Sequence, residues 1–139
     1  MAAEPLARLS QMLDLAQSLI DRVRPEQAGL RAAWQQAGDL SQEIDLPIGR
    51  VPKSFVVSQQ IAEFAVHSWD LATATGQQAS FPAETCDAAL AWARTALLPE
   101  FRGDEATGMA FGPEVPVPGD APAEDRLAAF FGRRPGPAQ

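Results

Sequence analysis

The chain has 139 residues, of which 46% are hydrophobic, and it carries a formal net charge of −7 with a single cysteine. This length suits one domain with one core. The negative net charge argues against a surface that binds the phosphates of a nucleic acid. Cys86 cannot form an intrachain disulfide, which is typical of a reducing cytoplasm. The N-terminus does not resemble a signal peptide, and no apolar run approaches the ~20 residues of a membrane span. We therefore expect a cytoplasmic, mainly helical protein that binds neither nucleic acid nor membranes.

The first half of the sequence predicts two helices followed by an extended segment. Residues 5–24 keep a helical apolar period, which Pro25 then interrupts. A second helix is expected from residue 25 or 26 to residue 37, with Gly38 as its stop. Residues 41–52 alternate polar and apolar side chains around a proline and a glycine, which indicates a short extended segment or a loose hairpin.

A long central helix is predicted over residues 53–75, with Pro52 before it and Gly76 as its C-terminal stop. Its polar residues fall within an arc of roughly 100° at the helical period of 3.6 residues. These are Gln59, Gln60, Glu63, His67 and Asp70. Apolar side chains cover most of the remaining surface, so this is expected to be the core helix of the domain.

The second half predicts two further helices joined by an irregular segment. The first runs from residue 82 or 83 to residue 98, and the second runs over residues 122–131 with Asp120 as its N-cap and Gly132 as its end. Residues 100–120 are rich in glycine and proline but carry apolar side chains that should pack on the surface. Trp69, Trp92 and Cys86 are expected to pack in or near the core, and the thiol is not expected to be a nucleophile. We assign residues 1–135 to one domain and expect the chain after Gly132 to be disordered, with residues 136–139 outside the domain.

Three polar residues of the central helix are the best candidates for a functional site. Glu63, His67 and Asp70 lie at positions i, i+4 and i+7, so they share one helix face. The pair Glu63 and His67 can offer an oxygen and a nitrogen to one metal ion, and Asp70 could orient the imidazole from behind. The alternative is that the only histidine of the chain is hydrogen-bonded to Glu63 or Asp70 at the edge of the core without any metal.

The sequence around this histidine resembles a known family. The run Val66-His-Ser-Trp-Asp-Leu-Ala-Thr-Ala-Thr-Gly76 is similar to the His-Gly-Trp-Asp-Leu-Ala-x-Ala-Thr-Gly signature of actinobacterial proteins related to mycothiol-dependent maleylpyruvate isomerase, within the DinB/YfiT-like superfamily. Supporting similarities are Asp45-Leu-Pro-Ile-Gly49, Phe111-Gly-Pro-Glu-Val-Pro-Val-Pro118 and Ala121-Pro-Ala-Glu-Asp-Arg-Leu-Ala-Ala-Phe-Phe-Gly132. Together they cover about residues 30–135 in order.

The resemblance implies an all-α, DinB-like helical bundle with a metal held by three side chains. Two of these ligands match Glu63 and His67, while the third is a histidine on a second bundle helix that this chain lacks. Relatives of the family place several dozen residues between the counterparts of Pro25 and Leu30. The bundle, truncated to about four or five helices plus a short extended hairpin, is therefore expected to be completed by a homodimer, formed side by side or by helix exchange. A two-fold axis near the site could then join two copies of each ligand.

Two functions follow from these considerations. The first is a divalent-metal-binding protein of this family with an incomplete intrachain site. If active, it would be a metal- and thiol-dependent isomerase or transferase, with zinc or nickel and with mycothiol or another small thiol as cofactors, acting on a small molecule. The second is a non-catalytic dimeric helical module that has lost the chemistry and serves binding or scaffolding. The sequence assigns neither catalytic nor thiol-binding residues.

Overall fold

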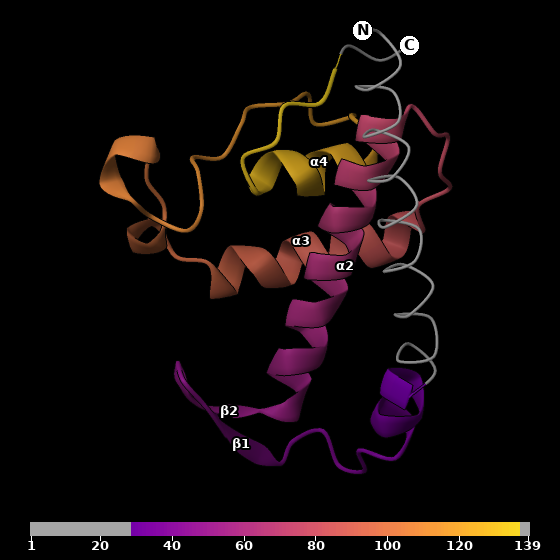
Figure 1. Ribbon diagram of the computed structural model, residues 1–139, viewed down its shortest axis with the longest axis vertical. Helices are drawn as coiled ribbons and strands as arrows, with labels where there is room; N and C mark the ends of the chain where they lie inside the picture. The colour runs from indigo at the N-terminus through magenta and orange to yellow at the C-terminus, as the bar shows by residue number, and fades with distance from the viewer. Residues whose placement is uncertain (1–28, 137–139) are drawn as a thin grey trace, which may run out of the picture. The chain divides into compact units, whose positions relative to one another are not determined.

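The structure is a computed structural model that describes residues 29–136 (Figure 1). The chain divides into two compact units, Met1–Leu40 and Ser41–Gln139. In the described part of the first unit, residues 29–35 are helical, and Gly38 beyond them has a positive φ of 67°, as expected of a helix stop. The helix predicted over residues 5–24 lies outside the described residues. The remaining elements, and the candidate site, belong to the second unit.

In the second unit, the structure decides between the two forms expected for residues 41–52 in favour of a hairpin. Strands β1 (Glu43–Leu46) and β2 (Gly49–Pro52) pair antiparallel, with Leu46 opposite Gly49, so that two residues form the turn. Gly49 has a φ of 122°, a conformation that favours a residue without Cβ. The hairpin leads directly into the central helix (Figure 1).

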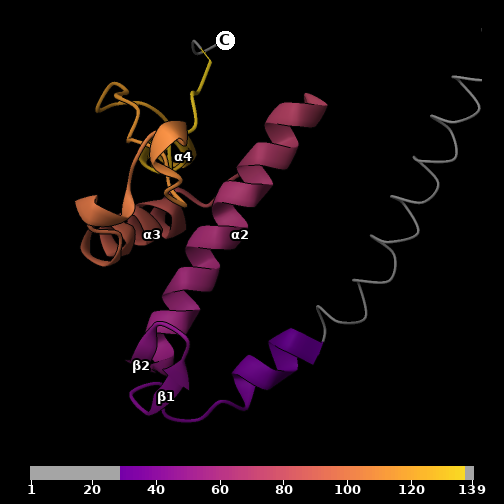
Figure 2. The same cartoon turned by 60° about the vertical axis from the view of Figure 1, so that its left-hand side comes forward.

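Helix α2 spans Lys53–Thr75, as the sequence predicts. Extended Pro52 precedes its first turn, and Gly76 ends it in the left-handed region with a φ of 64°. The amide of the next residue, Gln77, then donates to the carbonyl of Ala72 at 3.0 Å, which closes the last turn. Helices α3 (Ala83–Ala96) and α4 (Ala123–Phe130) lie on the same side of α2 (Figure 2).

The core of this unit forms where α2, α3 and α4 meet. Its buried members are Ala62, Val66, Cys86, Ala89, Leu90, Ala93, Ala123, Leu127 and Phe130. About half of them are alanines, which let the helices approach closely, and Leu127 on α4 is only 1% exposed. The protein is thus helix-rich with one small two-stranded sheet. Among the described helices, none is long and apolar enough to cross a membrane.

Between α3 and α4 the chain is irregular apart from two short 3₁₀ turns, η1 (Pro99–Phe101) and η2 (Glu105–Thr107). Helix α3 ends two residues before the predicted position, because Leu97 leaves helical geometry ahead of Pro99. Asp120 is not the cap of α4, since the helix begins after Pro122 and has no side-chain cap. Phe101 and Met109 pack less closely than predicted, and their exposed fractions are 52% and 49%.

Candidate functional site

The imidazole of His67 lies between two carboxylates on α2. Its Nε2 is 3.2 Å from Oε2 of Glu63, one turn earlier, and its Nδ1 is 3.2 Å from Oδ2 of Asp70, most of a turn later. The side chains of Glu63, His67 and Asp70 are 49%, 63% and 35% exposed. The structure therefore brings together the three predicted residues on one face, with His67 as the link and the two acids on opposite edges of its ring.

Asp70 is held from the other side by Arg133, which follows α4. Arg133 Nε donates to Oδ1 at 3.0 Å and Nη2 donates to Oδ2 at 2.8 Å, so the pair is bidentate. The hydrogen bond from Arg133 lowers the pKa of Asp70, and the contact with His67 lowers it further. The pKa of Arg133 is correspondingly raised by the hydrogen bond to Asp70. The result is a polar chain from Arg133 through Asp70 to the imidazole.

The prediction that the chain is disordered after Gly132 is wrong for Arg133. Gly132 has a φ of 86°, and the amides of Gly132 and Arg133 donate to the carbonyls of Ala129 and Ala128 at 3.0 Å each. This helix-ending turn directs Arg133 back toward α2. One feature of the sequence could have indicated this contact, namely a basic residue, Arg133, directly after a glycine that ends a helix. Nothing in the local sequence indicates that its partner is Asp70.

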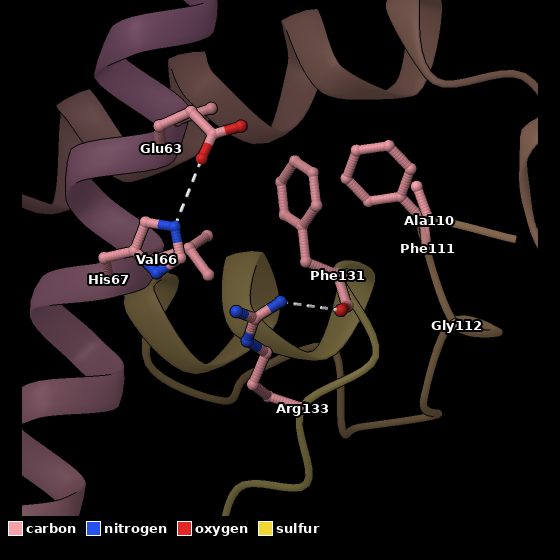
Figure 3. Close-up of a pocket in the computed structure, with 9 residues that line it drawn as sticks. Glu63, Val66, His67, Ala110, Phe111, Gly112, Phe131 and Arg133 are labelled. Carbon is pink, nitrogen blue, oxygen red and sulfur yellow. Dashed lines mark hydrogen bonds and ion pairs between the residues drawn. The ribbon is translucent and has the colours of Figure 1, made fainter. Parts of the chain in front are cut away.

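A cavity of about 240 Å³ lies beside this polar chain. Glu63 and His67 line it from α2, and Phe111, Phe131 and Arg133 line it from the opposite side (Figure 3). The Phe111 and Phe131 ring centroids are 6.0 Å apart, so the two rings form one aromatic wall. Arg133 Nη1 also donates to the Phe131 carbonyl at 3.0 Å, which fixes the guanidinium beside that wall.

A larger groove of about 660 Å³ continues from this cavity. Both hollows are lined by Ala62, Glu63, Ala110, Phe111 and Phe131. Beyond these shared residues the groove is mainly apolar, with Phe55 and Trp92 in its wall at a ring-centroid distance of 5.3 Å. The site thus has a polar end on α2 and an apolar remainder.

The donor set at the polar end fits part of a metal site. Ligand distances of about 2.0–2.2 Å in tetrahedral geometry place neighbouring donors roughly 3.4 Å apart. The 3.2 Å between Glu63 Oε2 and His67 Nε2 is close to this value. Asp70 at Nδ1 would hold the ring with Nε2 directed outward. Within residues 29–136, however, no group of three or more His, Cys, Asp or Glu side chains is placed so that it could hold a metal ion.

The remaining candidates from the sequence have structural roles. Trp69 is half-buried and its Nε1 donates to Asp125 Oδ1 at 2.7 Å, which links α2 to α4. Trp92 is partly buried and packs against the core. Cys86 is buried, and burial raises the pKa of its thiol, as expected of a packing residue rather than a nucleophile.

Comparison with known proteins identifies relatives without a described activity. Two uncharacterized proteins of Mycobacterium tuberculosis, from strains CDC 1551 / Oshkosh and ATCC 25618 / H37Rv, are each 38% identical to this chain over 121 residues. The alignment covers 79% of this chain, and the chain spans about 64% of the length of each relative. No protein-family profile and no solved structure matches the chain significantly.

Proposed function

We propose that this chain is a divalent-metal-binding protein of the DinB/YfiT-like superfamily, related to the mycothiol-dependent maleylpyruvate isomerase-like proteins. Glu63 and His67 are the proposed metal ligands. The observation that supports this most is the 3.2 Å separation of Glu63 Oε2 and His67 Nε2 on the wall of a cavity. A bound divalent ion would serve as a Lewis acid toward a carbonyl or thiol group of a small molecule.

The residues around the two ligands support the same proposal. Asp70 Oδ2 lies 3.2 Å from Nδ1, and in the tautomer with the ring proton on Nδ1 it would accept that proton and leave Nε2 for the metal. Arg133 neutralises Asp70 and keeps it ionised, because its hydrogen bond lowers the pKa of that carboxyl. Such an arrangement orients an imidazole for binding through Nε2. We further propose a cytoplasmic location, which the free, buried thiol of Cys86 supports.

The proposed ion needs more ligands than these two. Water, a substrate atom or a second copy of the chain would supply them. In a homodimer with a two-fold axis near α2, the two copies of Glu63 and His67 would make four donors, which is the number that zinc prefers.

Metal content tests the proposal. The purified protein would be incubated with zinc or nickel, desalted, and measured by elemental mass spectrometry together with Glu63→Gln and His67→Ala. We expect stoichiometric metal in the wild type and its loss in both variants. Glu84→Gln, at an exposed position of α3, is the matched control and should keep the wild-type metal content. A wild-type protein without metal, or equal metal in His67→Ala, would refute the proposal.

A second candidate function, a dimeric helical module without chemistry, is favoured by another face of α2. Ile61, Phe64 and Leu71 are 39%, 60% and 64% exposed. At 100° per residue they fall within an arc of roughly 80°, beside the polar face that carries His67. Large exposed apolar side chains on one helix face are typical of an association surface.

Light scattering tests this association. We expect the wild type to have the mass of a dimer, and Phe64→Ser to shift it toward the monomer. Phe101→Ser changes an apolar residue of similar exposure, 52%, away from this face and should leave the mass unchanged. A monomeric wild type at micromolar concentration would contradict the dimer. Dimerisation without metal would favour this second function over the first.

A further inference from the structure

The apolar groove beside Glu63 is built by five parts of the second unit. These are the hairpin turn at Ile48, helix α2, helix α3, the irregular segment with Phe101, Met109 and Phe111, and Phe131 after α4. Among the described residues that line it, only Gln59 and Glu63 are polar, and none is basic. The lining therefore offers no cationic side chain to a phosphate, a sulfate or a second carboxylate.

Several large apolar side chains that line this groove are exposed to solvent. Ile48, Phe101 and Met109 line it with exposed fractions of 70%, 52% and 49%. Ile48 lies in the hairpin turn, whereas Phe101 and Met109 lie more than fifty residues later, so the fold and not the local sequence brings them together. Apolar side chains left in water around a concave surface are typical of a ligand-binding groove.

The volume and polarity of the groove define its occupant. At about 660 Å³ it falls within the usual size range of pockets for small organic molecules. Its polar end is Glu63, which also lines the smaller cavity that contains His67. A ligand that lies in the groove would thus place one end at the proposed metal ligands and its remainder among aromatic rings.

We propose that the groove binds a small molecule with an uncharged aromatic or branched-aliphatic body and a head group that coordinates the cation at Glu63 and His67. The head-group part of this inference rests on the proposed function. The body is recognised by the groove alone, through burial of apolar surface and stacking on Phe111 and Trp92. Removing the metal should therefore weaken the binding of the head group and leave the binding of the body in the groove unchanged.

Calorimetry with three probes separates the two halves. The probes are 2-naphthohydroxamic acid, which has body and head, acetohydroxamic acid, which has the head alone, and 2-naphthamide, which has the body alone. On the zinc-loaded wild type we expect 2-naphthohydroxamic acid to bind at least about tenfold more tightly than either of the others, because a naphthyl group buries considerable apolar area. The amide should bind with and without zinc.

Two variants impair the groove by different means, one by filling it and the other by removing part of its lining. Ala96→Trp places a large ring inside it, and Phe101→Ser removes an exposed aromatic ring from its lining, a change that an exposed position tolerates. Both should weaken the two naphthyl probes at least about tenfold, in line with lost apolar burial, while zinc content and acetohydroxamic acid binding stay unchanged. Ala91→Trp, on an exposed position of α3 outside the groove, is the matched control and should behave as the wild type.

The results distinguish failure of this inference from failure of the proposed function. If zinc binds but the naphthyl group adds no affinity, or if both groove variants bind like the wild type, the inference is wrong and the metal site stands. If the wild type holds no zinc, the proposed function and the head group are wrong. If the wild type nevertheless binds 2-naphthamide and Ala96→Trp weakens that binding, the proposed recognition of an apolar ligand body would still stand. If Ala96→Trp instead splits a dimer and no probe binds, the groove is a subunit interface and the inference is overturned.

Discussion

Arg133 forms two hydrogen bonds with Asp70, a residue 63 positions earlier in the chain, at 3.0 Å and 2.8 Å. This contact joins the segment after α4 to the C-terminal part of α2. Because Asp70 also contacts the imidazole of His67, the position of the only histidine depends on a residue far from it in sequence.

Replacing Arg133 should destabilise the fold modestly. Arg133→Met removes both hydrogen bonds to Asp70, and we expect the free energy of unfolding in urea to fall by about 1 kcal/mol, since the pair is bidentate but only partly buried. Arg134→Met is the matched control, because Arg134 is the next residue and is exposed. Equal effects of the two substitutions would show that the Asp70 contact contributes nothing specific.

The stabilisation by Asp70 should depend on pH in a defined direction. The pKa of Asp70 in the folded chain is lowered from its ordinary value of 3.8, chiefly by Arg133. The carboxylate therefore stabilises the folded state above this ordinary value, and the contribution is lost as the pH falls through the lower folded pKa. We expect Asp70→Asn to be less stable than the wild type at pH 6 in EDTA, with the difference shrinking below pH ~4. A difference that grows toward acid would contradict this assignment.

If zinc binds at Glu63 and His67, Asp70→Asn should weaken its affinity without removing a ligand. Loss of an oriented carboxylate behind a metal-binding histidine typically lowers metal affinity about 10–100-fold. A competition titration with a zinc-binding dye measures this change. Asp87→Asn, which changes an α3 carboxylate paired with Arg126, should leave zinc affinity as in the wild type. Equal zinc affinity in Asp70→Asn would place Asp70 outside the site.

The hydrogen bond from Trp69 to Asp125 should contribute to the packing of α2 on α4. Asp125→Ala leaves the partly buried indole N–H without its acceptor, and we expect a loss of about 1–2 kcal/mol in the free energy of unfolding. Glu124→Ala removes the neighbouring acid from the same first turn and controls for the helix dipole. In a double-mutant cycle, Trp69→Phe and Asp125→Ala should be non-additive, and additive effects would refute the contact.

Cys86 should react slowly with thiol reagents in the native protein. It is 1% exposed, and burial raises the pKa of its thiol, so little thiolate is presented to solvent. We expect modification by Ellman's reagent at least about tenfold slower than at a thiol introduced by Ala91→Cys on the exposed side of α3, and fast modification in denaturant. Rapid reaction of the native wild type would show that this thiol is accessible.

The boundaries of α2 and the extended character of residues 41–52 were predictable because local chemistry decides them. Pro52 and Gly76 delimit the helix, and Gly49 allows the turn with its positive φ. The close approach of Glu63, His67 and Asp70 followed from helical spacing alone.

The rest of the site depends on tertiary packing that no local pattern carries. Phe111 and Phe131 form one wall although an irregular segment and a helix separate them in sequence. Arg133 meets Asp70 only because the turn at Gly132 fixes its direction. Asp120 illustrates the opposite error, since this favourable capping residue is not used and α4 begins after Pro122. Periodicity describes helix faces well, but it does not indicate which loop will cover them.

The two proposed ligands lie on successive turns of one continuous helix, at Glu63 and His67 of Lys53–Thr75. The helical backbone fixes the distance between their Cα atoms, so only rotation of the side chains can adjust the opening between oxygen and nitrogen. If a metal ion binds at this pair, α2 would fix the donor types and the spacing of the two Cα atoms. Discrimination between ions by coordination number would then depend on the further ligands that complete the site.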